Sequence, residues 1–263
     1  DRSGGRVPMA EYLAARGLDH IDVMVSTHTH EDHISGLLPL LEHWTPRELW
    51  QGLPAGFYRR TRPLNIPEDA NLSRRKFLQA LNDYRVLCAR IEERGGVIRT
   101  LAAPFGETPC RDLSVRVLAP SIPQAAELET LLSGVYDADA AAFWGCLDRL
   151  DARMNNFSLI LRLDFQDTRL LLPGDTNCLG YDGLDGAELR AHLFKVGHHG
   201  QRDGVSREQL QAIAPRAVVC CASSDRRYNS ADPGVLTMAA EGGARLYFSD
   251  CPPVPGAEVP LPP

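Results

Sequence analysis

The sequence has almost no lysine: Lys76 and Lys195 stand against 26 arginines, and the formal net charge is −6. An acidic protein does not coat nucleic acid through bulk electrostatics, which excludes a simple packaging protein. Two short stretches are nevertheless basic, Arg59 to Arg62 and Arg74 to Lys76. They could line a groove for a phosphate chain, but a solvated loop and helix start is the simpler interpretation.

Long apolar runs are absent too. No window approaches the roughly 18–20 apolar residues of a membrane span, and the first residues contain no apolar signal-peptide core. The seven cysteines include no Cys-x-x-Cys pair, which is typical of reduced thiols and not of a disulfide framework or zinc ribbon. We therefore expect a cytoplasmic protein without a membrane segment. No linker or repeat interrupts the sequence, so we expect one domain over residues 1–251 and a proline-rich tail over residues 252–263.

Histidine, in contrast, is concentrated in one stretch. Three of the eight histidines fall within six positions of Ser26-Thr27-His28-Thr29-His30-Glu31-Asp32-His33. The apolar run before them, residues 21–25, predicts a buried strand, so the motif lies on the loop at the carboxyl end of that strand. Such a density of imidazole and carboxylate groups indicates a metal site.

The spacing of the motif suits two adjacent metal ions. His28 and His30 alternate by two, so a nearly extended loop turns both rings to one side, while Asp32 and His33 follow as the chain enters a helix expected over residues 34–44. Neutral imidazole and carboxylate favour zinc, with manganese or iron as alternatives. Two ions about 3.5–4 Å apart lower the pKa of a bridging water and stabilise the attacking and leaving oxygens. Glu31 is expected to point away.

The order His28-x-His30-x-Asp32-His33 after a strand resembles the signature of the metallo-β-lactamase superfamily. The resemblance implies an α/β fold of the αββα sandwich type, with the metals at the edge between two sheets. Periodicity alone gives only mixed α and β structure. Domains of this family usually place a hairpin and another strand before the motif. The chain, which starts at Asp1 without an initiator Met, is therefore expected to be a fragment that lacks the first strands, and a missing N-terminal part or a protein partner would complete it.

Later motifs resemble the C-terminal hydrolase domain of ComEC-type competence proteins, over residues 18–250. In order they are Asn155-Asn156-x-Ser158, Gly174-Asp175, Lys195-Val196-Gly197-His198-His199-Gly200, and Arg227-Tyr228 before Asp232-Pro233. The resemblance implies a metal-dependent phosphodiesterase with single-stranded or duplex DNA as substrate. The transmembrane segments of competence channels are missing here, so DNA import is not implied.

Two positions depart from the family pattern. Most members have another histidine between the opening motif and the bridging aspartate, where this chain has only His43 on the following helix. Asn155, Asn156 or Ser158 would have to complete that first site, which favours a harder ion. The branch also has Gly-His-Pro after the tyrosine, where Asp232-Pro233 occurs here. Asp232 either replaces the imidazole or caps a helix that starts with proline.

The resemblance implies the following roles. His28 and His30 hold one metal, Asp32 and His33 hold the other together with His198 or Asp232, and Asp175 bridges the two. Lys195, His199 and Tyr228 are candidate catalytic residues with Asp32, although Lys195 is equally well explained as a strand-end lysine that reaches solvent. Candidate substrate contacts are Asn155, Asn156, Ser158, Arg226 and Arg227.

Periodicity and turn residues predict the remaining elements. The expected helices cover residues 8–16, 69–94, 124–132, 137–153, 208–214 and 232–241, and the expected strands cover residues 48–50, 97–101, 113–118, 158–163, 169–172, 192–196, 217–222 and 245–248. The clearest is the helix over residues 69–94, whose apolar residues recur at three- and four-residue steps before Gly95-Gly96.

Three functions remain open on this basis. The first is a nuclease or phosphodiesterase. The second is a hydrolase of a small ester, lactone or thioester, which would need a closed apolar pocket and no basic groove. The third is a metal-binding regulatory module with degraded catalysis, which the two missing imidazoles favour.

Overall fold

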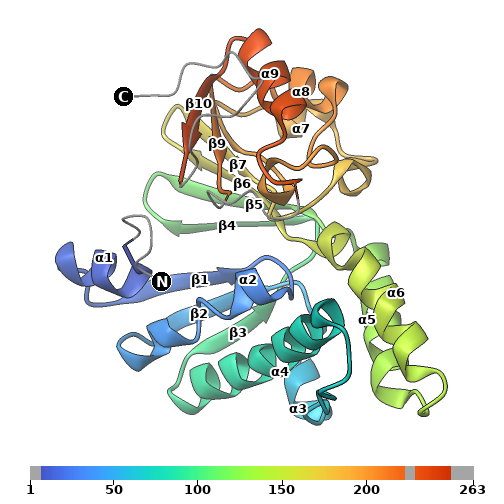
Figure 1. Cartoon of the computed structure of the whole chain (residues 1–263). Coiled ribbons are helices and arrows are strands. Elements are labelled where there is room, and N and C mark those ends of the chain that lie inside the picture. Colours follow the sequence, from blue (N-terminus) through green and yellow to red (C-terminus); the bar gives the residue numbers. More distant parts are fainter. Residues whose placement is uncertain (1–6, 223–228, 250–263) are drawn as a thin grey trace. The chain divides into compact units, whose positions relative to one another are not determined.

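The computed structural model describes residues 7–222 and 229–249. The chain forms two compact units, Asp1–Leu101 with Ile122–Met154, and Ala102–Ser121 with Asn155–Pro263 (Figure 1). Because the chain passes from one unit to the other three times, neither unit is a continuous segment. The expectation of a single domain over residues 1–251 stays a prediction.

The first unit contains a three-stranded parallel sheet in the order β1-β2-β3. The strands are β1 (Ile21–Ser26), β2 (Pro46–Gln51) and β3 (Val97–Thr100), close to the ranges that the sequence predicted. Parallel pairing brings the carboxyl ends of neighbouring strands to one edge of a sheet, so the loop after β1 emerges at the same edge as the loop after β2.

The helices of the first unit are α1 (Met9–Ala15), α2 (Glu31–Ile34), η2 (Pro39–Glu42), α3 (Phe57–Arg60), α4 (Leu72–Glu93), α5 (Ile122–Asp137) and α6 (Phe143–Met154). The prediction of α4 is confirmed. Asn71 caps it by accepting a hydrogen bond from the Arg74 amide at 2.9 Å, and its apolar stripe, which includes Phe77 and Tyr84, is buried.

The single helix expected over residues 34–44 is wrong. The chain forms one turn of α-helix, α2, which ends at Ile34, and then the separate 3₁₀ turn η2 that begins at Pro39. Proline has no backbone N–H to continue the i→i−4 ladder, and Gly36 in between adds backbone freedom, so a continuous helix does not form.

The second unit contains a seven-stranded mixed sheet in the order β10-β9-β8-β7-β6-β5-β4. Its strands are β4 (Phe105–Cys110), β5 (Leu113–Ala119), β6 (Ile160–Phe165), β7 (Thr168–Leu172), β8 (Leu193–Lys195), β9 (Ala217–Cys220) and β10 (Arg245–Phe248). Pairing is antiparallel from β4 to β7 and parallel from β7 to β10. The sequence did not predict β4, because Gly106 and Pro109 weaken its strand signal; proline is tolerated there since β4 lies at the sheet edge.

The second unit also has three α-helices among its described residues, α7 (Gly186–Leu189), α8 (Arg207–Ile213) and α9 (Pro233–Glu241), which lie together beside the sheet (Figure 1). Three 3₁₀ turns accompany them, η3 (Asn155–Phe157), η4 (Cys178–Tyr181) and η5 (His198–Gly200). Phe194, Val218 and Leu236 are buried in one apolar cluster that joins β8, β9 and α9. In the described part of the chain, no helix combines the length and apolarity needed to cross a bilayer.

Gly96 lies between α4 and β3, where there is no room for a side chain. A Cβ atom there would lie 2.6 Å from the Pro46 carbonyl oxygen and 2.6 Å from Ile91 Cγ2. We expect Gly96→Ala to lower the free energy of unfolding by about 1–3 kcal/mol in urea denaturation. Gly36→Ala is the control, because no atom lies within 4 Å of its added Cβ. Equal stability of the two variants would contradict this packing.

Candidate metal centre

The histidine cluster of the first unit follows β1 directly. The Nε2 atom of His28 lies 3.2 Å from the Nδ1 atom of His30, with the two rings nearly perpendicular. The His33 ring packs against His28 at a centroid distance of 4.2 Å. His28 is buried, whereas His30 and His33 are partly exposed. The two rings spaced by two residues thus turn to one side, as the extended loop predicted.

Thr27 contacts two of the three histidines through one hydroxyl. Its Oγ1 atom lies 3.1 Å from His28 Nδ1 and 3.4 Å from His33 Nδ1. A hydroxyl oxygen has two acceptor positions, so Thr27 can accept an N–H from both rings. In that arrangement the Nε2 lone pairs of both rings are directed elsewhere, as metal ligation requires.

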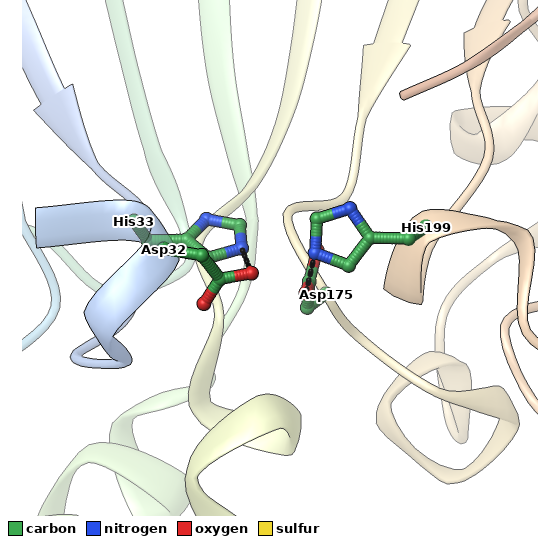
Figure 2. Close-up of side chains that lie close together, drawn as sticks. All are labelled: Asp32, His33, Asp175 and His199. Atoms are coloured by element: carbon green, nitrogen blue, oxygen red, sulfur yellow. Dashed lines mark ion pairs between the residues drawn. The ribbon is translucent and has the colours of Figure 1, made fainter. Parts of the chain in front are cut away.

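Asp32 and His33 lie in the first turn of α2, where the carboxylate is 3.6 Å from the His33 Nε2 atom (Figure 2). Glu31 instead reaches α4, where its carboxylate pairs with the Lys76 ammonium at 2.7 Å. This placement agrees with the expectation that Glu31 points away from the site. The two adjacent carboxylates therefore have different surroundings.

In the second unit, strand pairing gathers the motif residues at one edge of the sheet. Asp175 follows β7, and His198 and His199 follow its parallel neighbour β8. Because β6 is antiparallel to β7, the segment before β6 that contains Ser158 lies at this edge as well. Ser158 Oγ accepts a hydrogen bond from the Asp175 amide at 3.2 Å, and both side chains are buried.

The Asp175 carboxylate has two basic neighbours. Lys195 Nζ lies 3.2 Å from Oδ1 and donates to the Gly174 carbonyl at 2.8 Å, and His199 Nε2 lies 2.9 Å from Oδ2 (Figure 2). His199 Nδ1 lies 2.6 Å from the Cys221 carbonyl, which only accepts, so Nδ1 donates that hydrogen bond. Lys195 is 16% exposed, so its side chain is engaged at Asp175 and does not extend into solvent.

The histidine pair forms a strained turn. His198 and His199 both adopt left-handed backbone angles, with φ of 48° and 52°, which is uncommon for a residue with a Cβ atom. His198 contacts Asp203 through Nδ1 at 2.9 Å and Asn155 through Nε2 at 3.1 Å. The neighbour of Asp175 is thus His199, whereas the metal role of His198 stays a prediction.

Asp232 caps α9. Its Oδ1 atom accepts hydrogen bonds from the amides of Gly234 at 2.8 Å and Val235 at 3.3 Å, and Oδ2 lies 3.5 Å from Arg202 Nε. The capping interpretation is therefore confirmed. The alternative, that Asp232 replaces an imidazole as a ligand, stays a prediction.

The other expected substrate contacts divide into two groups. Asn155 and Asn156 lie in η3, and their Oδ1 atoms are buried and have no hydrogen-bond partner among the residues that the structure describes. Buried carbonyl oxygens of this kind are available to water or to a hard cation. Arg226, Arg227 and Tyr228 lie outside the described residues.

The two basic stretches of the first unit are largely neutralised by ion pairs. The pairs are Arg59 with Glu92, Arg60 with Glu129, Arg74 with Asp148, and Lys76 with Glu31. These contacts agree with the solvated-surface interpretation and weaken the case for a phosphate-binding groove.

Sequence reasoning missed two carboxylates that contact the histidines. Asp151 on α6 lies 3.1 Å from His30 Nε2, and Asp203 lies 2.9 Å from His198 Nδ1. Asp151 had no local signal, because it is 121 residues from His30 in sequence. Asp203 had none beyond its proximity to the histidine pair.

Comparison with known proteins agrees with these features. Residues 3–98, which include the histidine motif, match the profile of the metallo-beta-lactamase superfamily. The chain is similar to that superfamily over these residues. Its mixed α/β architecture, with one parallel and one mixed sheet, is consistent with the α/β sandwich of that superfamily, so the expected fold class is confirmed.

One similar protein is ComE operon protein 3 of Bacillus subtilis (strain 168). The two sequences are 24% identical over 248 residues, which cover 94% of this chain and 26% of the relative. The chain thus spans about a quarter of the length of this relative. The ComEC-type resemblance deduced from the motifs is confirmed.

In each unit a carboxylate and an imidazole are candidate metal ligands: Asp32 and His33 in the first unit, and Asp175 and His199 in the second. Two imidazoles and two carboxylates suit zinc, manganese or iron, so the donor chemistry fits the metal that the superfamily implies. Burial, and then the Asp203 carboxylate, raise the pKa of the Cys178 thiol, so this thiol stays protonated near neutral pH.

The Asp232→Ser variant separates capping from ligation. Serine keeps a capping oxygen but provides no carboxylate, so for a residue that only caps the helix we expect unchanged zinc content and a free energy of unfolding lower by less than about 1 kcal/mol. Elemental analysis after zinc reconstitution and urea denaturation measure both. Loss of a metal equivalent would instead assign Asp232 as a ligand.

Proposed function

We propose that this protein is a metal-dependent phosphodiesterase that acts on nucleic acid. The match to the superfamily over residues 3–98 and the candidate Asp and His ligands support the coarser statement, a metal-dependent hydrolase. The observation that carries the finer proposal is the contact of Lys195 Nζ with the Asp175 carboxylate at 3.2 Å. An ammonium group held beside a candidate ligand adds positive charge where a phosphoryl transition state is negative.

The ligands in this proposal are His28 and His30, which the resemblance implies, and four further residues with suitable donor atoms. Asp32 and His33 contribute from α2, Asp175 from the loop after β7, and His199 from the turn after β8. When bound, a pair of divalent ions would activate water and polarise the phosphoryl oxygens. We propose zinc as the metal, with manganese as the alternative, because imidazole and carboxylate ligands accept both.

Several protein groups would act directly around such a centre. Lys195 would stabilise negative charge on the phosphoryl oxygens, and the Gly174 carbonyl, which accepts from Nζ at 2.8 Å, holds the ammonium in place. The Cys221 carbonyl orients His199 through Nδ1. Asn155 and Asn156 are candidates to contact the substrate through their amide groups.

DNA as the substrate rests on the resemblance to the ComEC-type branch. The chain matches a ComE operon protein over 94% of its own length but covers only 26% of that relative, so substrate and pathway remain proposals. We also propose a cytoplasmic location, since the cysteines among the described residues are free thiols. A protein partner, or a segment beyond this chain, would complete the functional unit.

One observation favours a second candidate, a small-substrate ester, lactone or thioester hydrolase. The cations at Arg59, Arg60, Arg74 and Lys76 are engaged with carboxylates, which leaves less positive charge for a long phosphate chain. Because such surface pairs are weak, a polyanion can displace them. A comparison of substrates distinguishes the two candidates.

The metal-loaded protein should hydrolyse bis-p-nitrophenyl phosphate and linear DNA faster than a β-lactam or a lactone. The assays are run side by side with zinc and with manganese, and DNA binding should weaken steeply as salt rises. Turnover of lactone or lactam alone would support the small-substrate hydrolase. Inertness towards both classes in a protein that binds metal would favour the regulatory module.

The two neighbouring carboxylates at the start of α2 provide a matched pair of variants. Asp32→Ala should lower metal content and reduce phosphodiesterase activity by at least about 100-fold, because it removes a ligand. Glu31→Ala should retain the wild-type metal content and activity, since Glu31 pairs with Lys76. Circular dichroism checks that both variants fold. Equal activity of the two variants would contradict the assignment of Asp32.

A further inference from the structure

Asp151 lies at the histidine cluster although no sequence motif includes it. It is on α6, 121 residues after His30, and its Oδ1 atom lies 3.1 Å from His30 Nε2. Both side chains are partly buried, with exposed fractions of 31% for Asp151 and 22% for His30. The contact lies entirely within the first unit.

This contact determines which nitrogen of His30 carries the proton. A neutral imidazole has one N–H and one lone pair, and an ionised carboxylate can only accept. The hydrogen therefore resides on Nε2, next to Asp151. The lone pair is then on Nδ1, the atom that lies 3.2 Å from His28 Nε2.

The distance between those two facing nitrogens suits a shared ion. Two nitrogens each about 2.0–2.1 Å from one tetrahedral zinc ion are separated by about 3.3 Å. The 3.2 Å between His28 Nε2 and His30 Nδ1 matches that separation. His28 has its own oxygen partner on the other nitrogen, since Thr27 Oγ1 lies 3.1 Å from His28 Nδ1.

The His30 ring is held from two helices. Phe77 of α4 packs edge-on against it at a centroid distance of 5.4 Å, and Asp151 contacts it from α6. Asp148, one turn before Asp151, makes two hydrogen bonds to the Arg74 guanidinium of α4 at 2.9 and 2.6 Å. This ion pair links α6 to α4.

We propose that Asp151 is a positioning residue that orients His30 and fixes its Nδ1 atom as a metal ligand. The inference rests on the metal-binding part of the proposed function and not on its substrate. Carboxylates that hold a ligand histidine in this way raise its basicity and reduce the entropy lost on metal binding. Their loss typically lowers metal affinity by about 10–100-fold.

The test measures zinc affinity of the purified full chain by competition with a chromophoric chelator. Asp151→Ala should weaken the tightest zinc site by about 10–100-fold. Asp148→Ala is the matched control: it removes the same charge from the same helix, and although it also removes the ion pair to Arg74, zinc affinity should change by less than about threefold. The urea midpoint of the metal-free protein should be the same for Asp151→Ala and the wild type.

A double-mutant cycle shows whether Asp151 acts through His30. In a His30→Ala background, the Asp151→Ala change should no longer affect zinc affinity, because the ring that it orients is gone. An undiminished loss in that background would overturn the proposal and indicate a direct ligand or a general charge effect. Should Asp151→Ala fail to fold, the near-isosteric Asp151→Asn goes through the same cycle.

The outcomes also separate this inference from the proposed function. Wild-type affinity in Asp151→Ala would overturn the positioning role alone and leave the hydrolase proposal standing. Absence of zinc binding by the wild type would overturn both. If the wild type binds zinc and the double-mutant cycle gives the expected result, but phosphodiesters are not cleaved, the positioning role is supported. The phosphodiesterase proposal is then rejected.

Discussion

Parallel pairing of strands is the constraint from which the candidate site follows. Neighbouring parallel strands end at the same edge of a sheet, so the loops after β7 and β8 deliver Asp175 and His199 to one place. The antiparallel hairpin of β6 and β7 adds Ser158 to that edge from the opposite chain direction. In the first unit, the parallel sheet likewise leaves the histidine loop at a carboxyl edge. The chemistry of each unit therefore depends on backbone hydrogen bonds made well away from the ligands.

The turn that contains His198 and His199 is strained, and neighbouring groups hold it in place. His198 and His199 hold left-handed backbone angles that cost free energy, and they are surrounded by fixed partners in Asp203 and the Cys221 carbonyl. Gly200, whose φ is 71°, completes the turn where a side chain would meet Cys220 Sγ at 3.0 Å. The histidine turn is thus specified by its surroundings and not by helical or strand propensity.

The sequence predicted the elements whose signals are local. The helix α4 followed from apolar residues at helical spacing between Asn71 and Gly95, and the cap of α9 followed from Asp232 before a proline. The break between α2 and η2 was missed, because the apolar pattern outweighed Pro39 in the prediction. The resemblance to the superfamily followed from the spacing of three histidines and Asp32, which needed no tertiary information.

The partners of those histidines could not be predicted in the same way. Asp151 is far from His30 in sequence, and only the packing of α6 beside α4 brings the two together. The partners of the basic stretches could not be predicted either. Arg59 and Arg74 stood out as a cluster of charge, but their acidic partners, Glu92 and Asp148, are distant in sequence. Sequence spacing predicts which residues can bind a ligand. Packing determines which of them are already paired with other side chains.

The repeated passage of the chain between the two units limits how the protein can be divided. The segment that matches the superfamily profile ends at residue 98, but the first unit is completed only by Ile122–Met154, after an excursion through the second. A shortened protein that ended at the family match would retain all three motif histidines. It would lose α6, and with it the carboxylate beside His30. The segment that identifies the family therefore does not contain all the residues that form the histidine cluster.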